Sequence, residues 1–147
     1  MRRPEHFEGE RARTVADATP HWDDPPTPPA GSPNVVVILL DDTGFAQLGC
    51  FGSDIDTPNI DALAANGLRF TDFHVTPLCS PTRAALLTGR ANHAVGMRFV
   101  SNIRTGFPNQ LGHISNHATT MAAVLGAAGY ATFCTGKWHL APMEQCS

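Results

Sequence analysis

The sequence has no apolar run long enough to cross a bilayer. Its longest such run extends only from Val35 to Leu40, whereas a spanning helix needs about 20 apolar residues. Two arginines follow Met1 without an apolar stretch behind them, so we expect no secretory leader and a cytoplasmic location. Positive charge is not in excess either, because Lys plus Arg number 10 and Asp plus Glu 13. Nucleic acid and membrane are therefore not expected partners.

Cysteine is scarce, and its spacing excludes two classes of small protein. The four cysteines are Cys50, Cys79, Cys134 and Cys146. They lack the close pairs of a zinc site and the density of a disulfide scaffold. In a reducing compartment such residues are mostly buried thiols, or one of them is reactive. Only Cys79 is followed closely by proline and arginine, so we interpret the other three as ordinary thiols.

Regular structure is not expected at the start of the chain. Residues 1–33 hold 7 of the 12 prolines, including Pro25, Pro26, Pro28 and Pro29. Proline has no backbone N–H and is excluded from helix interiors and central strands. We interpret residues 1–33 as a proline-rich arm or linker. Two alternatives are open: an arm that packs on the body, or a disordered tail without a role.

Residues 34–147 have the pattern of an α/β protein. The continuous apolar run over 34–40 is rich in β-branched residues, as in a strand buried on both faces. Apolar segments then alternate with helix signals, which favours a sheet with flanking helices. The expected strands are 34–40, 68–75 and 130–135. The expected helices begin at Thr57-Pro58, Ser80-Pro81 and Thr119 or Thr120, and end at Gly67, near Gly89 and at Gly129, with a long loop over 91–117.

Two acidic residues, Asp41 and Asp42, follow the first expected strand. Ligand sites of open α/β sheets lie at the carboxyl ends of strands. Adjacent carboxylates at this place repel each other, and a hard divalent cation with oxygen ligands would relieve the repulsion. The alternative is a turn in which either carboxylate accepts hydrogen bonds from nearby backbone N–H groups.

Cys79 lies directly before the expected Ser80-Pro81 helix start, and Arg83 is one turn further on. Free N–H groups and the helix dipole favour an anion at this position, and a guanidinium suits a sulfate or phosphate oxyanion. A thiol placed there is a candidate nucleophile. The alternative is a half-buried structural cysteine beside a solvated arginine.

Lys137 and His139 follow the third expected strand. Residues two apart on an extended segment point to the same side. A cation and an imidazole could together bind an anionic ester and protonate its leaving oxygen. The alternative is a surface lysine next to a histidine with ordinary hydrogen bonds.

Two stretches resemble the signatures of the sulfatase family. Residues 79–90, CSPTRAALLTGR, match the first signature, C-x-P-[ST]-R-x-x-x-[LI]-T-G, at every specified position. Residues 129–139, GYATFCTGKWH, resemble the second signature. They depart from it at Thr135, where a smaller or apolar residue is more usual.

The start of the body is similar to the opening of the same family. Asp41-Asp42 follow an apolar strand, and the motif TPNID comes later at residues 57–61. The resemblance runs from about Asn34 to Leu140 and is strongest to bacterial arylsulfatases. It implies the α/β fold of the alkaline-phosphatase-like superfamily.

The resemblance also implies a chemistry. Asp41 and Asp42 would bind Ca²⁺, or alternatively Mg²⁺. A separate formylglycine-generating enzyme would oxidise Cys79 to formylglycine, and the hydrated aldehyde would ligate the metal as well. One of its hydroxyls would attack the sulfur of a sulfate ester, and the second would release sulfate.

Three further side chains have roles in that resemblance. Arg83 would stabilise the hydrate and the developing charge, Lys137 would bind a sulfate oxygen, and His139 would contact the diol or transfer a proton. Family members are several times longer, with further metal ligands downstream. We therefore expect residues 34–147 to be the N-terminal part of a catalytic domain, with little or no turnover alone. The alternatives are a phosphonate monoester or phosphodiester hydrolase of the same superfamily, and a non-catalytic truncated product.

Overall fold

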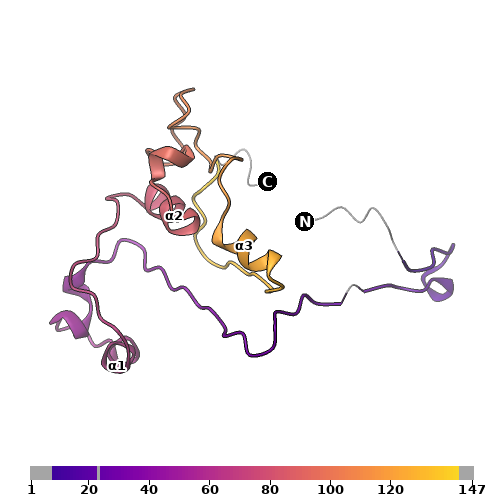
Figure 1. Cartoon of the computed structure of the whole chain (residues 1–147), viewed down its shortest axis with the longest axis horizontal. Coiled ribbons are helices and arrows are strands. Elements are labelled where there is room, and N and C mark those ends of the chain that lie inside the picture. Colours follow the sequence, from indigo (N-terminus) through magenta and orange to yellow (C-terminus); the bar gives the residue numbers. More distant parts are fainter. Residues whose placement is uncertain (1–7, 23, 143–147) are drawn as a thin grey trace.

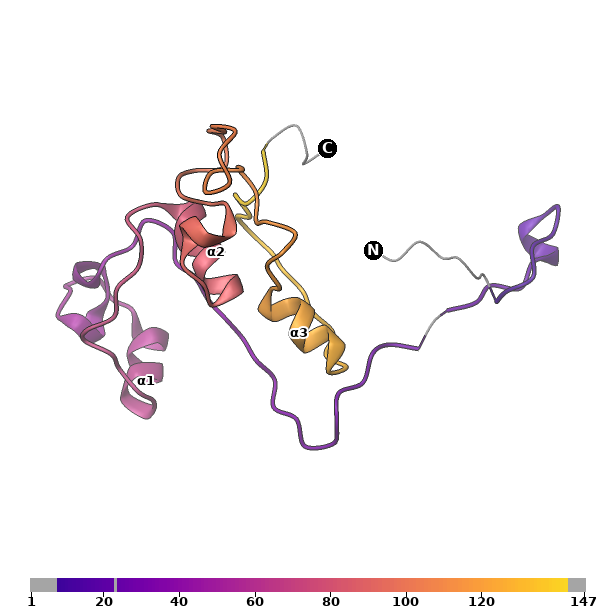
Figure 2. The same cartoon turned by 45° about the horizontal axis from the view of Figure 1, so that its top comes forward.

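The computed structural model describes residues 8–22 and 24–142, so expectations for the first residues and for Cys146 lie outside it. Figures 1 and 2 place helix α2 (Cys79–Thr88) at the centre, between α1 (Pro58–Asn66) and α3 (Met121–Ala127). Within the described ranges, no helix is long and apolar enough to span a membrane. Short 3-10 helices occur at η1 (Val15–Asp17), η2 (Phe45–Gln47), η3 (Gly49–Phe51) and η4 (Asn92–Val95).

The expected strands at 34–40, 68–75 and 130–135 do not form in the described part of the chain. The backbone bridges found there are two isolated pairs elsewhere. A parallel strand is stable only when neighbouring strands pair with its N–H and C=O groups and helices cover its faces. The first segment instead runs as a single chain (Figure 1), with Val36 80% and Ile38 74% exposed. Its β-branched residues favour a strand, but no other segment of the described residues pairs with it.

Helices α1 and α3 begin where the capping signals predict. Thr57 and Pro58 open α1, which ends at Asn66. The fixed φ of proline suits the first helical turn, where its missing N–H removes no hydrogen bond. In α3 the hydroxyl of Thr120 accepts a hydrogen bond from the Ala123 N–H at 3.2 Å. Short-range signals were thus sufficient to place both helix starts.

Helix α2 begins two residues earlier than predicted, at Cys79 and not at Pro81. Cys79 is its first residue and Leu78 is the N-cap, not Ser80. Pro81 still falls in the first turn, where the N–H has no helical partner to lose. Ser80 is buried, and its hydroxyl accepts a hydrogen bond from the backbone N–H of Ser101 at 3.2 Å, a tertiary contact in place of a cap. Cys79 therefore sits inside the first turn of the helix.

The hydrophobic core lies where α2 meets the loop between η4 and α3. Fully or nearly fully buried apolar side chains in the described residues are Ala84, Val95, Met97 and Leu140, with Leu87, Ile114 and Ala118 packed against them. Leu140 comes directly after the segment that contains the predicted Lys137 and His139. Its burial holds that segment against α2, next to Cys79.

The proline-rich arm passes close to the end of α3. Gly129 has a φ of +89°, and a β-carbon added there would lie 2.5 Å from the carbonyl oxygen of Thr27. A side chain at this position would strain the backbone and collide with the arm. The arm segment at Thr27 therefore packs against the body at this glycine.

Replacing Gly129 with alanine is expected to destabilise the protein by about 1–2 kcal/mol, the cost of a β-carbon in left-handed backbone, and to release the arm from α3. Thermal unfolding and limited proteolysis of the arm measure the two effects. Gly126→Ala is the matched control, because Gly126 lies inside α3 with nothing within 4 Å of an added β-carbon. It should stabilise by about 0.5–1 kcal/mol. Equal behaviour of the two variants would contradict the packing of the arm at Gly129.

Candidate active site

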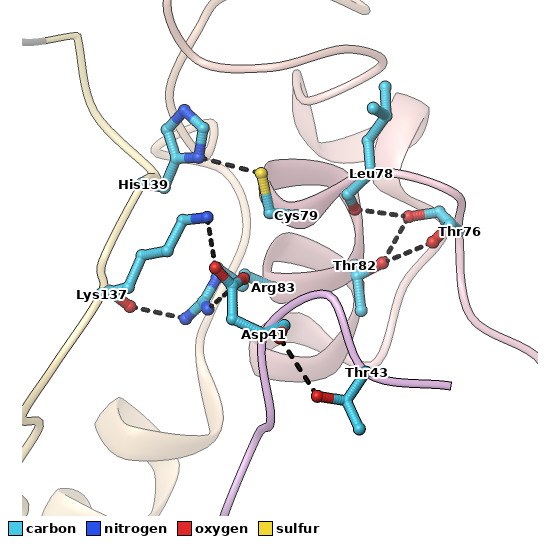
Figure 3. Close-up of polar contacts among 9 residues, drawn as sticks. All are labelled: Asp41, Thr43, Thr76, Leu78, Cys79, Thr82, Arg83, Lys137 and His139. Carbon is cyan, nitrogen blue, oxygen red and sulfur yellow. Dashed lines mark hydrogen bonds and ion pairs between the residues drawn. The ribbon is translucent and has the colours of Figure 1, made fainter. Parts of the chain in front are cut away.

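Three segments that are distant in the sequence meet at the first turns of α2. Figure 3 shows five of the predicted site residues joined by hydrogen bonds or ion pairs: Asp41, Cys79, Arg83, Lys137 and His139. Asp42 is the exception. Its side chain is exposed, and within the described residues it has no hydrogen-bond or ion-pair partner. Its backbone φ of 52° is unusual for a residue other than glycine.

The Asp41 carboxylate bridges two cations. Its Oδ2 lies 2.7 Å from Lys137 Nζ, and its Oδ1 lies 3.1 Å from Arg83 Nη2. Arg83 donates a second hydrogen bond, from Nη1 to the backbone carbonyl of Lys137, at 2.5 Å. The guanidinium fork thus ties α2 to the segments on either side of it. The Arg83 side chain is only 12% exposed, so this fork is held in place by its surroundings.

Cys79 and His139 form the second contact of the site. The Sγ of Cys79 lies 3.0 Å from Nδ1 of His139, and the other ring nitrogen, Nε2, lies 3.1 Å from Oδ1 of Asn102. His139 has a φ of 52°. Such backbone costs on the order of 1–3 kcal/mol and persists only where surrounding contacts enforce it. The histidine is therefore held in an unfavourable conformation with its ring directed at Cys79.

The ion pair shifts two pKa values. The hydrogen bond from Lys137, and then the one from Arg83, lowers the pKa of Asp41 below its usual value. The hydrogen bond to Asp41 raises the pKa of Lys137, and the negative charge of a Cys79 thiolate would act in the same direction. Both charges are therefore present together across the neutral range. Because the pair is exposed, solvent and salt screen the interaction.

The site offers oxygen ligands of the type that a hard cation prefers, but too few of them to complete its coordination shell. Carboxylate oxygens of Asp41 and Asp42 are suitable ligands for Ca²⁺, which takes about 6–8 oxygen ligands. Among the residues that the structure describes, no three His, Cys, Asp or Glu side chains are grouped so as to hold a metal ion. Both oxygens of Asp41 also face cationic side chains. This part of the chain therefore supplies at most a fraction of a coordination shell.

Sequence reasoning missed one residue of this site, Asn102. It lies in the long loop, outside both signature-like stretches, and no spacing rule connects it to His139. His74 pairs with Asp72 at 2.6 Å on the exposed surface. Cys134 is exposed, and Cys50 is half-buried near α1.

Residues 33–147 match the sulfatase family model. The chain is 49% identical over 116 residues to arylsulfatase A of Homo sapiens, an alignment that covers 76% of this chain and 22% of that protein. It is 42% identical over 115 residues to an uncharacterized sulfatase of Schizosaccharomyces pombe, covering 74% of this chain and 21% of that protein. It is 40% identical over 113 residues to the arylsulfatase of Klebsiella aerogenes, covering 74% and 24%.

The family match extends over more than half of the chain and includes every site residue described above. The α/β fold of the family is thereby assigned, although the described residues form helices and no sheet. The chain spans between 21% and 24% of the length of these three relatives. These matches agree with the resemblance of the two signature-like stretches, and the chain belongs to the sulfatase family.

Proposed function

We propose that this chain carries the nucleophile and anion-binding half of the active site of a sulfuric ester hydrolase that acts on aryl sulfates. The observation that supports this most is the convergence of Cys79, Arg83, Lys137 and His139 at the start of α2, with Asp41 between the two cations. Proteins named as arylsulfatases are similar to this chain over about three quarters of its length. A cation pair beside a reactive position suits a substrate with a negatively charged sulfate.

Cys79 would be the precursor of the nucleophile, converted to formylglycine by a formylglycine-generating enzyme. A hydrated aldehyde at residue 79 would supply one hydroxyl to attack sulfur and a second to release sulfate. The position suits an anionic centre, because the first turn of α2 presents free N–H groups and the positive end of the helix dipole. His139, with Nδ1 toward residue 79, would accept or return a proton at that position.

Arg83 and Lys137 would bind sulfate oxygens. Both already hold a carboxylate, Asp41, in the geometry of charge-assisted hydrogen bonds. A sulfate oxygen is an acceptor of the same kind. The cations would also stabilise negative charge that develops on the transferring group, the kind of contribution that is commonly the largest in such sites.

Asp41, Asp42 and the hydrated aldehyde formed from Cys79 would be the ligands that this chain contributes to a Ca²⁺ ion, with Mg²⁺ as the alternative. A bound divalent cation would supply Lewis-acid polarisation of an oxygen. Asp41 would then hold the metal and the two cationic side chains in fixed relation to each other. Among the described residues, no group of three or more His, Cys, Asp or Glu side chains completes this site.

The test uses the full-length protein produced together with a formylglycine-generating enzyme. Mass spectrometry of the Cys79 peptide should show the aldehyde, and an aryl sulfate should be hydrolysed faster than the matching aryl phosphonate. Faster hydrolysis of the phosphonate would instead assign the protein to the phosphonate and phosphodiester hydrolases. An unmodified thiol together with no turnover of either ester would identify a non-catalytic product.

A further inference from the structure

We propose that Asn102 is a positioning residue that holds the His139 ring with Nδ1 facing residue 79. The inference rests on the proposed function, in which His139 transfers a proton at that position. Asn102 lies in the loop between η4 and α3, and its Oδ1 is 3.1 Å from His139 Nε2. On the opposite side of the ring, Nδ1 is 3.0 Å from Cys79 Sγ.

The chemistry of the amide oxygen determines which ring nitrogen carries hydrogen. An amide oxygen only accepts hydrogen bonds, so the contact requires a hydrogen on Nε2. In a neutral imidazole the lone pair is then on Nδ1, toward residue 79. The hydroxyl of Ser101 donates to the same Asn102 oxygen at 3.2 Å. With the amide oxygen at this position, one acceptor atom satisfies both contacts.

The loop that carries Asn102 is anchored to the same helix turn as Cys79. Ser101 is fully buried, and its backbone N–H donates to the hydroxyl of buried Ser80 at 3.2 Å. Gln110, which is 3% exposed, holds the loop from the other side: its Oε1 accepts from the Phe99 N–H at 2.5 Å. The position of Asn102 relative to residue 79 is therefore set by buried contacts, although Asn102 itself is exposed.

The backbone of His139 shows why a positioning contact is needed. Its φ of 52° is left-handed, an uncommon conformation that costs free energy in a residue other than glycine. The ring is held at both nitrogens, by Cys79 and by Asn102. Loss of the Asn102 contact would leave only the contact with residue 79, so the ring could rotate or adopt the other tautomer.

The test compares Asn102→Leu, which keeps the size but removes the acceptor, with Asn102→Asp, which keeps an acceptor oxygen. In the full-length protein we expect Asn102→Leu to lower kcat for an aryl sulfate by roughly 10- to 100-fold, less than the largest losses known for a proton-transfer group. KM should change little, and Asn102→Asp should recover most of kcat. Asn116→Leu, an exposed asparagine in the same loop, is the matched control.

Two further measurements separate positioning from a general structural role. In a His139→Ala background the Asn102→Leu substitution should have no further effect on kcat, because its action passes through the histidine. Nitrogen-15 NMR of ring-labelled histidine, at a pH where imidazole is neutral, should show the Nε2–H tautomer for His139 and its loss in Asn102→Leu. Additive effects on kcat, or an unchanged tautomer in Asn102→Leu, would overturn the inference. The NMR result stands even if the wild-type protein hydrolyses no sulfate ester, which would reject the proposed function alone.

Discussion

Replacing Cys79 with alanine is expected to abolish aryl sulfate hydrolysis by the full-length protein, with kcat reduced by at least ~10³-fold. The reason is that alanine can be neither oxidised to an aldehyde nor act as a nucleophile, while the cations around it remain. Initial rates with para-nitrophenyl sulfate measure the loss. Cys134→Ala is the matched control, because Cys134 is an exposed free thiol outside the site. Residual turnover near the wild-type rate in Cys79→Ala would reject the proposed nucleophile.

The Cys79→Ser variant should fail in a different and more informative way. A serine hydroxyl could attack the ester, but the product would lack the second hydroxyl that releases sulfate from an aldehyde hydrate. We expect residue 79 to acquire one covalent sulfo group, visible by mass spectrometry of the intact protein, and turnover to stop there. Repeated turnover by the serine variant would show that release of sulfate needs no aldehyde.

Local sequence signals indicated candidate site residues, but not the contacts among them. The helix signal after Cys79 placed this residue at the start of α2, whereas the strand expected before Asp41 does not form in the described residues. The ion pair of Asp41 with Lys137, however, joins residues 96 apart in the sequence. No periodicity describes such a contact. The family resemblance, not the spacing, brought these residues into one site.

The expected strands do not form in the described residues because strand formation is not a local property. The segment over 34–40 has the apolar, β-branched composition of a buried strand. Composition determines whether the side chains of a segment can be buried on both of its faces. A strand also needs neighbouring strands that form hydrogen bonds with its backbone. The hydrogen bonds of helix α3 join residues of the helix to one another and to their immediate neighbours in the sequence, so its start and end followed from Thr120 and Gly129.

The core was also not evident from the sequence, because much of it lies in irregular structure. Val95 and Met97 are completely buried, yet they belong to the loop region expected over 91–117. Their burial depends on Ala84 of α2 and on Leu140 rather than on any repeating apolar pattern. Amphipathic periodicity finds core residues only where a regular element presents a face. Asn102 also lies in irregular structure, where no periodic pattern identifies it.

Removing the charge of Lys137 is the second substitution with a large expected effect. Lys137→Met keeps an unbranched side chain of similar length but loses the cation beside Asp41, and we expect kcat/KM for an aryl sulfate to fall by about 10²–10³-fold. Lys137 is the only lysine of the chain and lies outside the Cys79–Arg83 signature. Formylglycine content at residue 79 should therefore stay at the wild-type level, which mass spectrometry checks. Arg13→Met, which removes an exposed cation from the arm, is the matched control.

The activity of a second variant, Lys137→Arg, separates two roles of Lys137. If the ammonium only holds Asp41 in place, then Lys137→Arg should restore activity, because a guanidinium also pairs with a carboxylate. If the ammonium binds a sulfate oxygen, recovery should be partial, because the planar fork cannot take the place of a compact charge. Asp41 still has Arg83 as a partner in Lys137→Met. Loss of the ion pair alone is therefore a small, solvent-screened change, and wild-type kcat/KM in Lys137→Met would show that the lysine does not contact the substrate.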